Sequence, residues 1–412
     1  MNILFFTHYF PPEGNAPATR VYELCRRWVK AGHTVTVITG VPNVPNGVVY
    51  DGYRNRLRQE ENVAGIRVIR VWTYLAPNKG KGRRIVNYLS YMFSAILCGM
   101  FVKRPDVIIA TSPQFFCGWA GAVVSRLRRL PFILEVRDIW PESIEAVGAM
   151  SNRSLLRFLE RLELRLYAAA DHIVTVGEGY KQKLMEKIKL VGKISIIPNG
   201  VDLEAFVSRE PDAVIRQKLG LKDCFVCSYI GTIGMASGLE VVLEAARRLK
   251  KIGRDDVKFL LVGDGAVKDE LQSAATMEGL DNVVFTGRQD KSKIPDFLAL
   301  SDACLVHLKK KDIFETVMPS KIYEAAAMSR PIILGVGGHA AKLISDTGAG
   351  ICIEPENAGQ LVDAVKRLVD NPSLCRIFGE KGRVLVKSFY DCDRLAREYE
   401  AIIQKVLSVI SN

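Results

Sequence analysis

The sequence is poor in the residues that bind metal ions. Its 412 residues include five histidines, at positions 8, 33, 172, 307 and 339, and they are dispersed along the chain. The nine cysteines are scattered, and the one CxxC pair, Cys224 and Cys227, lies inside an apolar run without the second pair that a zinc site requires. We therefore expect no metal site, and buried, reduced thiols of a protein in the cytoplasm.

Three catalytic signatures are missing. The sequence has no GxxxxGK[ST] phosphate-binding loop, no GxSxG nucleophile elbow, and no DxD between a strand and a helix to hold a Mg-diphosphate. Their absence disfavours a P-loop nucleotidase and a hydrolase with that elbow. No basic residues precede the apolar start of the chain, so we expect no signal peptide.

Acidic residues are scarce in the first half of the chain. Residues 1–198 hold 28 Lys and Arg against 15 Asp and Glu, a net charge of +13, whereas residues 199–412 hold 29 against 30, a net charge of −1; the sum is the overall +12. This asymmetry predicts that the first half meets an anionic partner, such as nucleic acid, a phosphate-bearing lipid or a membrane surface. Nucleic acid is disfavoured because the basic residues form no recognisable binding module with aromatics.

Residues 85–102 form a stretch of 18 uncharged residues, IVNYLSYMFSAILCGMFV, after the basic segment NKGKGRR. It is slightly shorter than the about 20 apolar residues of a spanning helix. Arginines followed by aromatics are typical of a helix that lies in the headgroup region of a membrane. The residues that indicate this are Arg83, Arg84, Tyr88, Tyr91 and Phe93. The alternative is a buried helix with a solvated basic flank.

A second basic stretch, NRSLLRFLERLELRLY, places arginine at every fourth position from 153 to 165. On a helix these side chains form one positive stripe, with Arg157 and Arg161 at its middle, and we expect it to face the membrane or the acceptor. The alternative is that Glu160 and Glu163 make this an ordinary solvated helix.

Short, nearly continuous apolar runs alternate with helical patterns along the chain. Such runs are typical of parallel strands that are covered on both faces. The pattern pauses at IIPNGVD, residues 196–202, and then restarts. We therefore predict an α/β protein of two tandem, Rossmann-like, doubly wound domains, residues 1–198 and 199–390, and a helical tail that breaks near Tyr390.

Ligands of parallel α/β sheets bind at the carboxyl ends of the strands, so the strand-to-helix turns are the candidate sites. The amides of Gly14 and Asn15 precede a helix and can face an anion. Arg288 follows a later strand and can offer its guanidinium to a base or a phosphate. A third turn, YIGTIGMASGLE, has small and hydroxyl residues that let amides approach a phosphate closely. The residues concerned are Gly231, Thr232, Ser237 and Gly238. The alternative for each is a plain turn or a surface residue.

The stretch TVMPSKIYEAAAM opens a helix with Met318, Pro319 and Ser320. The Ser320 hydroxyl can cap the helix or bind phosphate. Lys321 lies at the positive end of the helix dipole, where a cation is unfavourable unless an anion is near. Glu324 lies one turn further, where it can accept hydrogen bonds from two ribose hydroxyls. The alternative for Lys321 and Glu324 is a surface ion pair.

These motifs resemble the GT-B glycosyltransferases of family 4. FPPEGNAPAT, IIPNGVD, VGDG and PSKIYEAAAMSRPI carry the likeness nearly end to end, and GTIGMASGLE, PSKIYE and RDIWPES are similar to bacterial O-antigen and capsule enzymes that transfer N-acetyl-L-fucosamine. The resemblance implies a retaining enzyme with an interdomain cleft. It also implies an acceptor domain at 1–198, a nucleotide-sugar domain at 199–390, and a last helix, 391–412, that packs back on the first domain.

The resemblance further implies a UDP-sugar donor, an undecaprenyl-diphosphate-linked sugar as acceptor, and a peripheral position on the inner face of the cytoplasmic membrane. No metal or other cofactor is implied, because helix dipoles and cations stabilise the leaving diphosphate. The alternatives are a UDP-GlcNAc-type epimerase of the same fold and a transferase of another UDP- or GDP-sugar.

The sequence departs from the family's pattern at three places. Thr316 stands where the first of two glutamates, eight positions apart, is usual, so Thr316 or the amides beside it are expected to face the sugar while Glu324 keeps the ribose role. The Arg and Lys that usually grip the diphosphate are absent after the strand that ends at position 230, and Lys321, with Ser320 and Arg288, is expected to replace them.

The third departure lies in RDIWPES. Arg137 stands where many members have histidine, which leaves Asp138 and Glu142 as the nearby carboxylates. The candidate catalytic residues are therefore Arg137, Asp138, Lys321 and Glu324.

Overall fold

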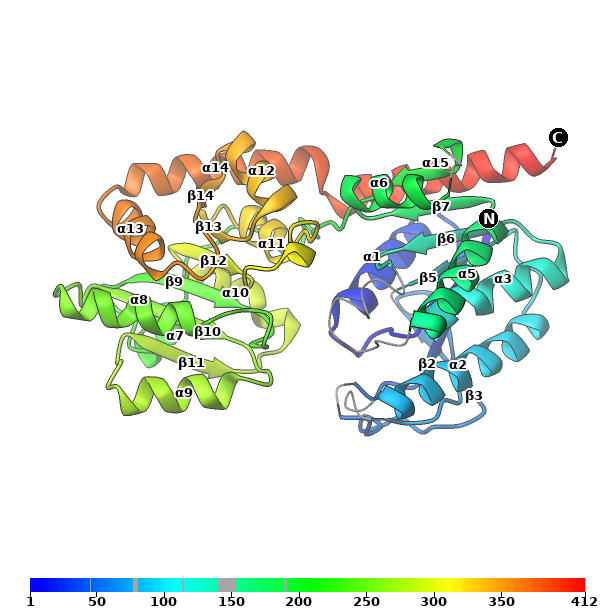
Figure 1. The fold of residues 1–412 in the computed structure, drawn as a ribbon, viewed down its shortest axis with the longest axis horizontal. Coiled ribbons are helices and arrows are strands. Elements are labelled where there is room, and N and C mark those ends of the chain that lie inside the picture. Colours follow the sequence, from blue (N-terminus) through cyan, green and yellow to red (C-terminus); the bar gives the residue numbers. More distant parts are fainter. Residues whose placement is uncertain (45, 77–80, 113–114, 140–152, 189–190, 412) are drawn as a thin grey trace. The chain divides into compact units, whose positions relative to one another are not determined.

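The structure is a computed structural model that describes residues 1–44, 46–76, 81–112, 115–139, 153–188 and 191–411. The chain forms two compact units, Met1–Asn199 with Cys392–Asn412, and Gly200–Asp391. Each boundary lies one residue after the predicted one. Figure 1 shows both units and labels most of their helices and strands.

The first unit is built on an eight-stranded sheet with the order β3-β4-β2-β1-β5-β6-β7-β8. Its strands are β1 (Asn2–Phe6), β2 (Thr34–Gly40), β3 (Arg58–Val63), β4 (Ile66–Val71), β5 (Val107–Thr111), β6 (Phe132–Val136), β7 (His172–Thr175) and β8 (Ile194–Ile196). All neighbours are parallel except β3, which pairs antiparallel with β4 at the edge. Strand β3 was not predicted from the sequence because RQEENV is polar and not an apolar run, as suits an edge strand.

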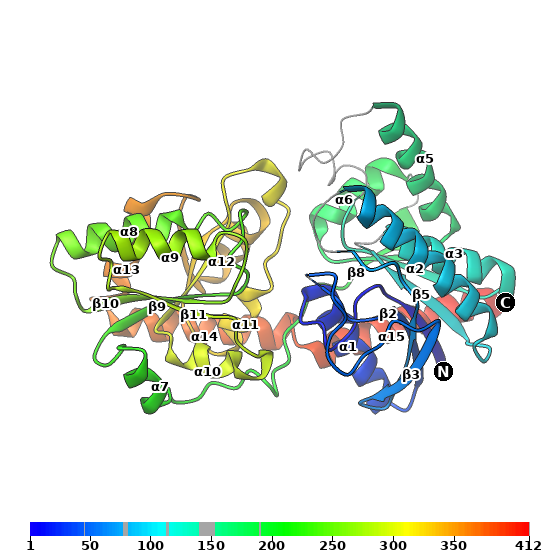
Figure 2. The same ribbon diagram turned by 90° about the horizontal axis from the view of Figure 1, so that it is seen from below.

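Helices cover both faces of this sheet (Figure 2). They are α1 (Ala16–Lys30), α2 (Lys81–Phe101), α3 (Phe115–Arg128), α5 (Arg153–Ala169), α6 (Glu178–Lys187) and α15 (Cys392–Ser411). Side chains of α2, α3 and α5 form one core with the sheet, and those of α1 and α15 form the other. The last helix therefore belongs to the first unit, as expected from the family resemblance. Trp28 of α1 donates its indole N–H to the carbonyl of Ala396 in α15 at 3.1 Å.

The second unit has a six-stranded parallel sheet with the order β11-β10-β9-β12-β13-β14. All six strands coincide with predicted apolar runs: β9 (Phe225–Ile230), β10 (Val257–Val262), β11 (Val283–Gly287), β12 (Ala303–His307), β13 (Ile332–Gly335) and β14 (Gly350–Cys352). The order reverses between β9 and β12, as it does between β1 and β5 in the first unit. In doubly wound sheets ligands bind beside such reversals, at the carboxyl ends of the strands.

The helices of the second unit are α7 (Ala213–Lys218), α8 (Glu240–Lys251), α9 (Lys268–Met277), α10 (Ile294–Leu300), α11 (Lys321–Ala327), α12 (Gly338–Thr347), α13 (Ala358–Val369) and α14 (Pro372–Phe389). The predicted break in the helical tail is the gap between α14 and α15, at Tyr390 and Asp391. All nine cysteines lie in the described ranges and are free. In the part of the chain that the structure describes, no three His, Cys, Asp or Glu side chains gather in a way that could hold a metal ion.

Candidate functional site

Lys321 lies over the turn that follows β9. Its Nζ is 3.8 Å from the centre of the Tyr229 ring and 2.5 Å from the Tyr229 hydroxyl. A Cβ on Gly231 would overlap the Cε of Lys321, and Gly231 has a φ of 142°. Both the close approach and the backbone conformation therefore require glycine at 231. The fold brings together two of the predicted donor-binding segments, which are 90 residues apart in sequence.

Glu324 lies one turn into α11 and is partly buried. Burial raises the pKa of its carboxyl group, and the positive charges of Lys291 and Lys321 act against that rise. No ion pair joins Lys321 to Glu324 among the described side chains, so the surface-pair alternative does not describe them. Lys291 was not singled out from the sequence, although the basic segment DKSK after β11 was a signal for it.

Ser237 is corrected from a donor-binding to a loop-forming residue. Its side chain is buried, and its hydroxyl accepts from the Tyr229 hydroxyl at 2.9 Å and donates to the Thr232 carbonyl at 3.0 Å. The hydroxyl is thus engaged inside the turn and is not available to a phosphate. Thr232 itself is exposed.

Gly238 is likewise a packing residue. It is buried, with a φ of 59°, and a Cβ there would lie 3.2 Å from the His307 ring. His307 donates from Nδ1 to the Ser237 carbonyl at 2.7 Å and accepts at Nε2 from the Glu356 amide at 2.8 Å. These two bonds assign the neutral tautomer with the proton on Nδ1, and burial lowers the pKa of His307 accordingly. The dispersed histidines of the sequence gave no sign of this role.

The segment before α11 does not cap the helix with a side-chain hydroxyl. Ser320 occupies the N-cap position in a helical conformation, and its side chain makes no capping bond, so that alternative is wrong. Thr316, Met318 and Pro319 are partly buried next to it, whereas Arg288 is exposed at the end of β11.

Glu315, the carboxylate residue next to Thr316, contacts the start of α12. Its carbonyl accepts from the His339 amide at 3.0 Å, and its side chain lies beside Gly337 at the start of α12. The backbone of Glu315 is therefore held against α12, one position from where the family's carboxylate would stand.

In the first unit, Asn15 caps α1. Its side-chain oxygen accepts from the Ala18 amide at 2.9 Å, so this oxygen is not free for a ligand. Gly14 is exposed, and none of the described atoms lies within 4 Å of the position that a Cβ would take there. The start of α1 is thus open at Gly14.

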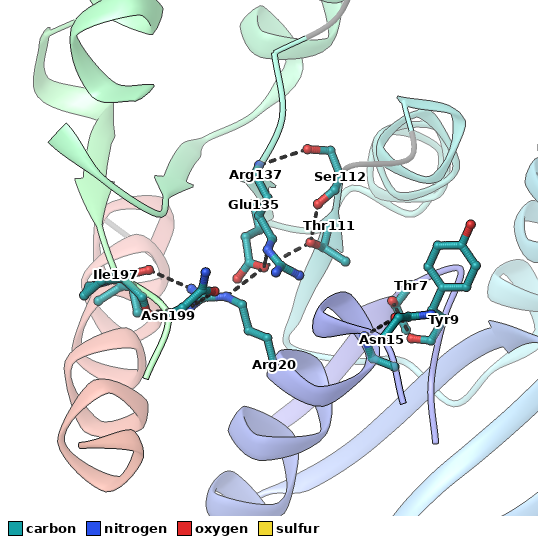
Figure 3. A network of polar contacts seen from close by, with 12 residues as sticks. Thr7, Tyr9, Asn15, Arg20, Thr111, Ser112, Glu135, Arg137, Ile197 and Asn199 are labelled. Carbon is teal, nitrogen blue, oxygen red and sulfur yellow. Dashed lines mark hydrogen bonds and ion pairs between the residues drawn. The ribbon is translucent and has the colours of Figure 1, made fainter. Parts of the chain in front are cut away.

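A buried charged network lies at the carboxyl end of β6 (Figure 3). Glu135 is fully buried and accepts from the Arg20 Nε of α1 at 3.2 Å and from the Thr111 hydroxyl at 3.0 Å. Arg20 also donates to the carbonyls of Ile197 and Pro198. This pair was not predicted from the sequence, although a glutamate inside the apolar run FILEV was a signal that a buried partner exists.

Arg137 belongs to the same network. Its amide donates to the Ser112 hydroxyl at 3.0 Å, and its Nε lies 3.9 Å from Glu135 Oε1, too far for a hydrogen bond. Asp138 is partly buried. Burial of Tyr180 raises the pKa of that residue, and the charge of Asp138 adds to the rise. The structure thus brings Arg137 and Asp138 together near Tyr180, while Glu142 lies outside the described residues.

Two of the predicted membrane-facing residues are buried instead. Tyr91 is fully buried, with its hydroxyl 2.9 Å from the carbonyls of Thr7 and Ile38, and Tyr88 is buried with its hydroxyl bonded to Arg84. Both predictions are wrong because an uncharged helix sequence does not show which of its faces the core takes.

The opposite face of α2 is exposed and apolar. Phe93 and Leu97 are each 65% exposed and Phe101 is 74% exposed, which makes a stripe at intervals of four residues. Gly82–Phe101 is long and apolar enough to cross a membrane, with 28% of it buried, but core helices of soluble proteins pass the same test.

The basic stripe of α5 is exposed. Arg157 and Arg161 face solvent, whereas Glu163 is buried and pairs with Lys187 at 2.7 Å. Glu163 therefore does not neutralise the stripe on the surface, although Glu160 is exposed beside it.

Comparison with known proteins agrees with both halves of this architecture. Residues 15–200 match the glycosyl transferase 4-like domain, and residues 212–385 match glycosyl transferases group 1. The chain is 27% identical over 391 residues to the putative colanic acid biosynthesis glycosyl transferase WcaI of Escherichia coli, which covers 89% of this chain and 92% of the relative. It is 25% identical to the probable glycosyltransferase WbjE of Pseudomonas aeruginosa, over 71% of this chain and 74% of that one.

Solved structures show the same fold. Sucrose-phosphate synthase of Thermosynechococcus elongatus superposes with a TM-score of 0.75 at 18% identity, over 99% of both chains. HepE of Anabaena in complex with UDP-glucose superposes with a TM-score of 0.72 at 16% identity, over 98% of this chain and 100% of that chain. With a 4-like domain in its first half and a group 1 domain in its second, the chain belongs to the GT-B glycosyltransferases.

Proposed function

We propose that this glycosyltransferase acts in the synthesis of a surface polysaccharide such as an O-antigen or a capsule. In this proposal it moves an amino sugar, with N-acetyl-L-fucosamine as the first candidate, from a UDP-sugar to a lipid-linked glycan precursor. The relative named for colanic acid synthesis supports the pathway class, as does the O-antigen chain mannosyltransferase C of Escherichia coli, which is 26% identical over 61% of this chain and 65% of that one. The UDP-glucose complex of a protein with the same fold supports a nucleotide-sugar donor.

The observation that carries the proposal is that Lys321 lies over Gly231 at the carboxyl edge of the second sheet, with Glu324 one turn further along α11. A bare glycine turn lets amides approach a phosphate, and the Lys321 ammonium supplies positive charge directly above it. Glu324 offers carboxylate oxygens to the ribose hydroxyls one helical turn away. Together these groups fit a nucleoside diphosphate.

The proposed reaction is a substitution at the anomeric carbon in which UDP leaves. In the retaining route that the family implies, the bond to the diphosphate breaks, the bond to the acceptor hydroxyl forms on the same face, and the leaving phosphate oxygen takes the acceptor's proton. In that case the protein needs no general base, and its task is to stabilise the charge that develops on the diphosphate. Lys321 is the described side chain best placed for this, and no metal is needed for it.

We expect a matching UDP-sugar to raise the unfolding midpoint of the protein, because a ligand that binds only the folded state stabilises it. We expect the Lys321→Met variant to bind UDP about tenfold to a hundredfold more weakly, because a charge-assisted bond to phosphate is lost. A panel of UDP- and GDP-sugars in a thermal-shift assay, followed by calorimetry with UDP, measures both. Lys268→Met, on α9, is the control. Equal UDP affinities of wild type and Lys321→Met would contradict the assignment. Conversion of a UDP-sugar without acceptor would indicate the epimerase alternative.

We also propose that the first unit docks on the anionic inner surface of the cytoplasmic membrane, where an undecaprenyl-diphosphate-linked acceptor resides. The support is the exposed apolar stripe of α2 and the exposed Arg83 and Arg84 at the start of the same helix, together with the arginine stripe of α5. Apolar side chains that enter the headgroup region next to basic residues are the usual means of peripheral attachment.

Replacement of Arg83 and Arg84 by Glu, or of Leu97 by Asp, is expected to release the protein from vesicles that contain phosphatidylglycerol. Each basic residue near an anionic surface contributes about 1 kcal/mol, so reversing two charges weakens binding by more than about tenfold. Co-sedimentation measures the bound fraction, and Val384→Asp, at an exposed site of α14, is the control. Unchanged sedimentation of both variants would exclude this surface as the docking site.

A further inference from the structure

Arg137 is a buried cation without its full set of partners. Its side chain is 8% exposed, and neither Nε nor Nη1 has a hydrogen-bond partner among the residues that the structure describes, while both atoms are covered from solvent. The nearest carboxylate oxygen, Glu135 Oε1, already accepts from Arg20 and Thr111. One carboxylate therefore serves two guanidinium groups.

Such an arrangement is costly unless something compensates for it. A buried donor that lacks a partner destabilises the folded state, and more so when it is charged. Burial lowers the pKa of Arg137 to about 10, and Glu135 opposes this only in part because the charge of Arg20 acts in the same direction as burial. The group stays protonated at neutral pH and retains an excess of positive charge.

The position of Arg137 is that of a ligand site. It is the first residue after β6, and its amide is held by Ser112 at the end of β5, next to the reversal of strand order between β1 and β5. Arg20, which shares Glu135, lies in the second turn of α1, whose start is open at Gly14. Figure 3 shows Arg20 reaching from α1 to the Glu135 that lies beside Arg137.

We propose that Arg137 anchors an oxyanion site in the first unit, and that its ligand is the phosphate or diphosphate group of a substrate. Glu135 and Arg20 are positioning residues that hold Arg137 at the edge of the sheet. When the ligand binds, the Arg137 side chain rotates about its own torsions and brings its buried N–H groups to the phosphate. The phosphate then balances the charge of Arg137, which in the free protein is only partly balanced by the Glu135 carboxylate shared with Arg20. This rests on the proposed function and extends it, because both substrates proposed there carry a diphosphate.

The test measures binding of inorganic pyrophosphate by calorimetry to the full chain in the Lys321→Met background, so that the second unit contributes little. We expect Arg137→Gln to weaken binding about tenfold to a hundredfold, Arg137→Lys to weaken it less, and Arg397→Gln, at an exposed position of α15, to leave it unchanged. Equal pyrophosphate affinity with and without the Arg137→Gln substitution would overturn the proposal. Failure of the proposed function would instead appear as equal UDP affinities of the wild type and the Lys321→Met variant.

A second readout separates a ligand site from a structural one. In buffer without multivalent anions, Arg137→Met is expected to keep or raise the unfolding midpoint, because it removes an under-compensated buried charge. A fall of several degrees together with unchanged pyrophosphate affinity would show that Arg137 is structural. Binding of UDP and of a short-chain polyprenyl diphosphate to Arg137→Gln shows which substrate supplies the phosphate group, because only the true ligand binds this variant more weakly. If neither compound loses affinity, the proposal fails.

Discussion

The Glu324→Ala variant is expected to lose about a hundredfold or more in turnover at low donor concentration. A carboxylate that accepts hydrogen bonds from two ribose hydroxyls makes two charge-assisted bonds, each contributing about 1.5–3 kcal/mol. Steady-state kinetics with the donor found in the UDP-sugar panel measures the loss, and Glu270→Ala, at an exposed position of α9, is the matched control. Turnover like that of wild type would remove Glu324 from the site.

The pH dependence gives an independent check on Glu324. Its pKa is raised by burial, so the carboxylate is protonated at a higher pH than an ordinary glutamate, and donor affinity should fall correspondingly early on acidification. A group whose pKa is raised on folding stabilises the fold below its unfolded pKa and loses that contribution as the pH rises through its folded pKa. At neutral pH, Glu324→Gln should therefore not lower the unfolding midpoint even though it lowers activity. A variant that lost both together would indicate a structural role.

The Trp28→Ala variant is expected to lower the free energy of unfolding of the first unit by about 3–5 kcal/mol. Trp28 is 1% exposed, its ring packs edge-on against Tyr399 with centroids 5.3 Å apart, and its N–H bonds to Ala396. The substitution thus removes core volume and leaves a carbonyl of α15 without its donor. For a unit of this size the unfolding midpoint should fall by about 10 °C.

Calorimetry with limited proteolysis tests this prediction. Loosening of α15 should expose the bonds after Arg394 and Arg397 to trypsin in Trp28→Ala. Trp72→Ala, at a position 39% exposed, should change stability by less than about 1 kcal/mol. An unchanged midpoint and an uncut α15 in Trp28→Ala would show that this contact does not hold the last helix on the first unit.

The fold class was predictable from the sequence for a simple physical reason. Strands of a parallel sheet are covered on both faces, so their sequences are continuous apolar runs. All of the parallel strands were predicted from such runs. The edge strand β3 escaped the same reasoning because one of its edges is unpaired and its side chains are polar. The segments around Gly231 and Lys321 were also predictable, since residues at strand ends meet at one edge of a sheet.

The partners of individual side chains were not predictable. Tyr91 and Phe93 are two residues apart in one uncharged stretch, yet the first is buried under β1 and β2 and the second faces outward. Ser237 has the hydroxyl of a phosphate ligand, but Tyr229 and Thr232 use it within the turn. A helix or turn presents several faces, and only packing decides which of them meets the core.

The sequence by itself determined that the chain forms two doubly wound units and which turns lie at their carboxyl edges, because periodicity and turn chemistry are local properties. Only the tertiary structure decided that Lys321 lies over Gly231 and that Glu135 is shared between Arg20 and Arg137. The two arginines are 117 positions apart, so no local sequence pattern predicts that one buried carboxylate balances the charges of both.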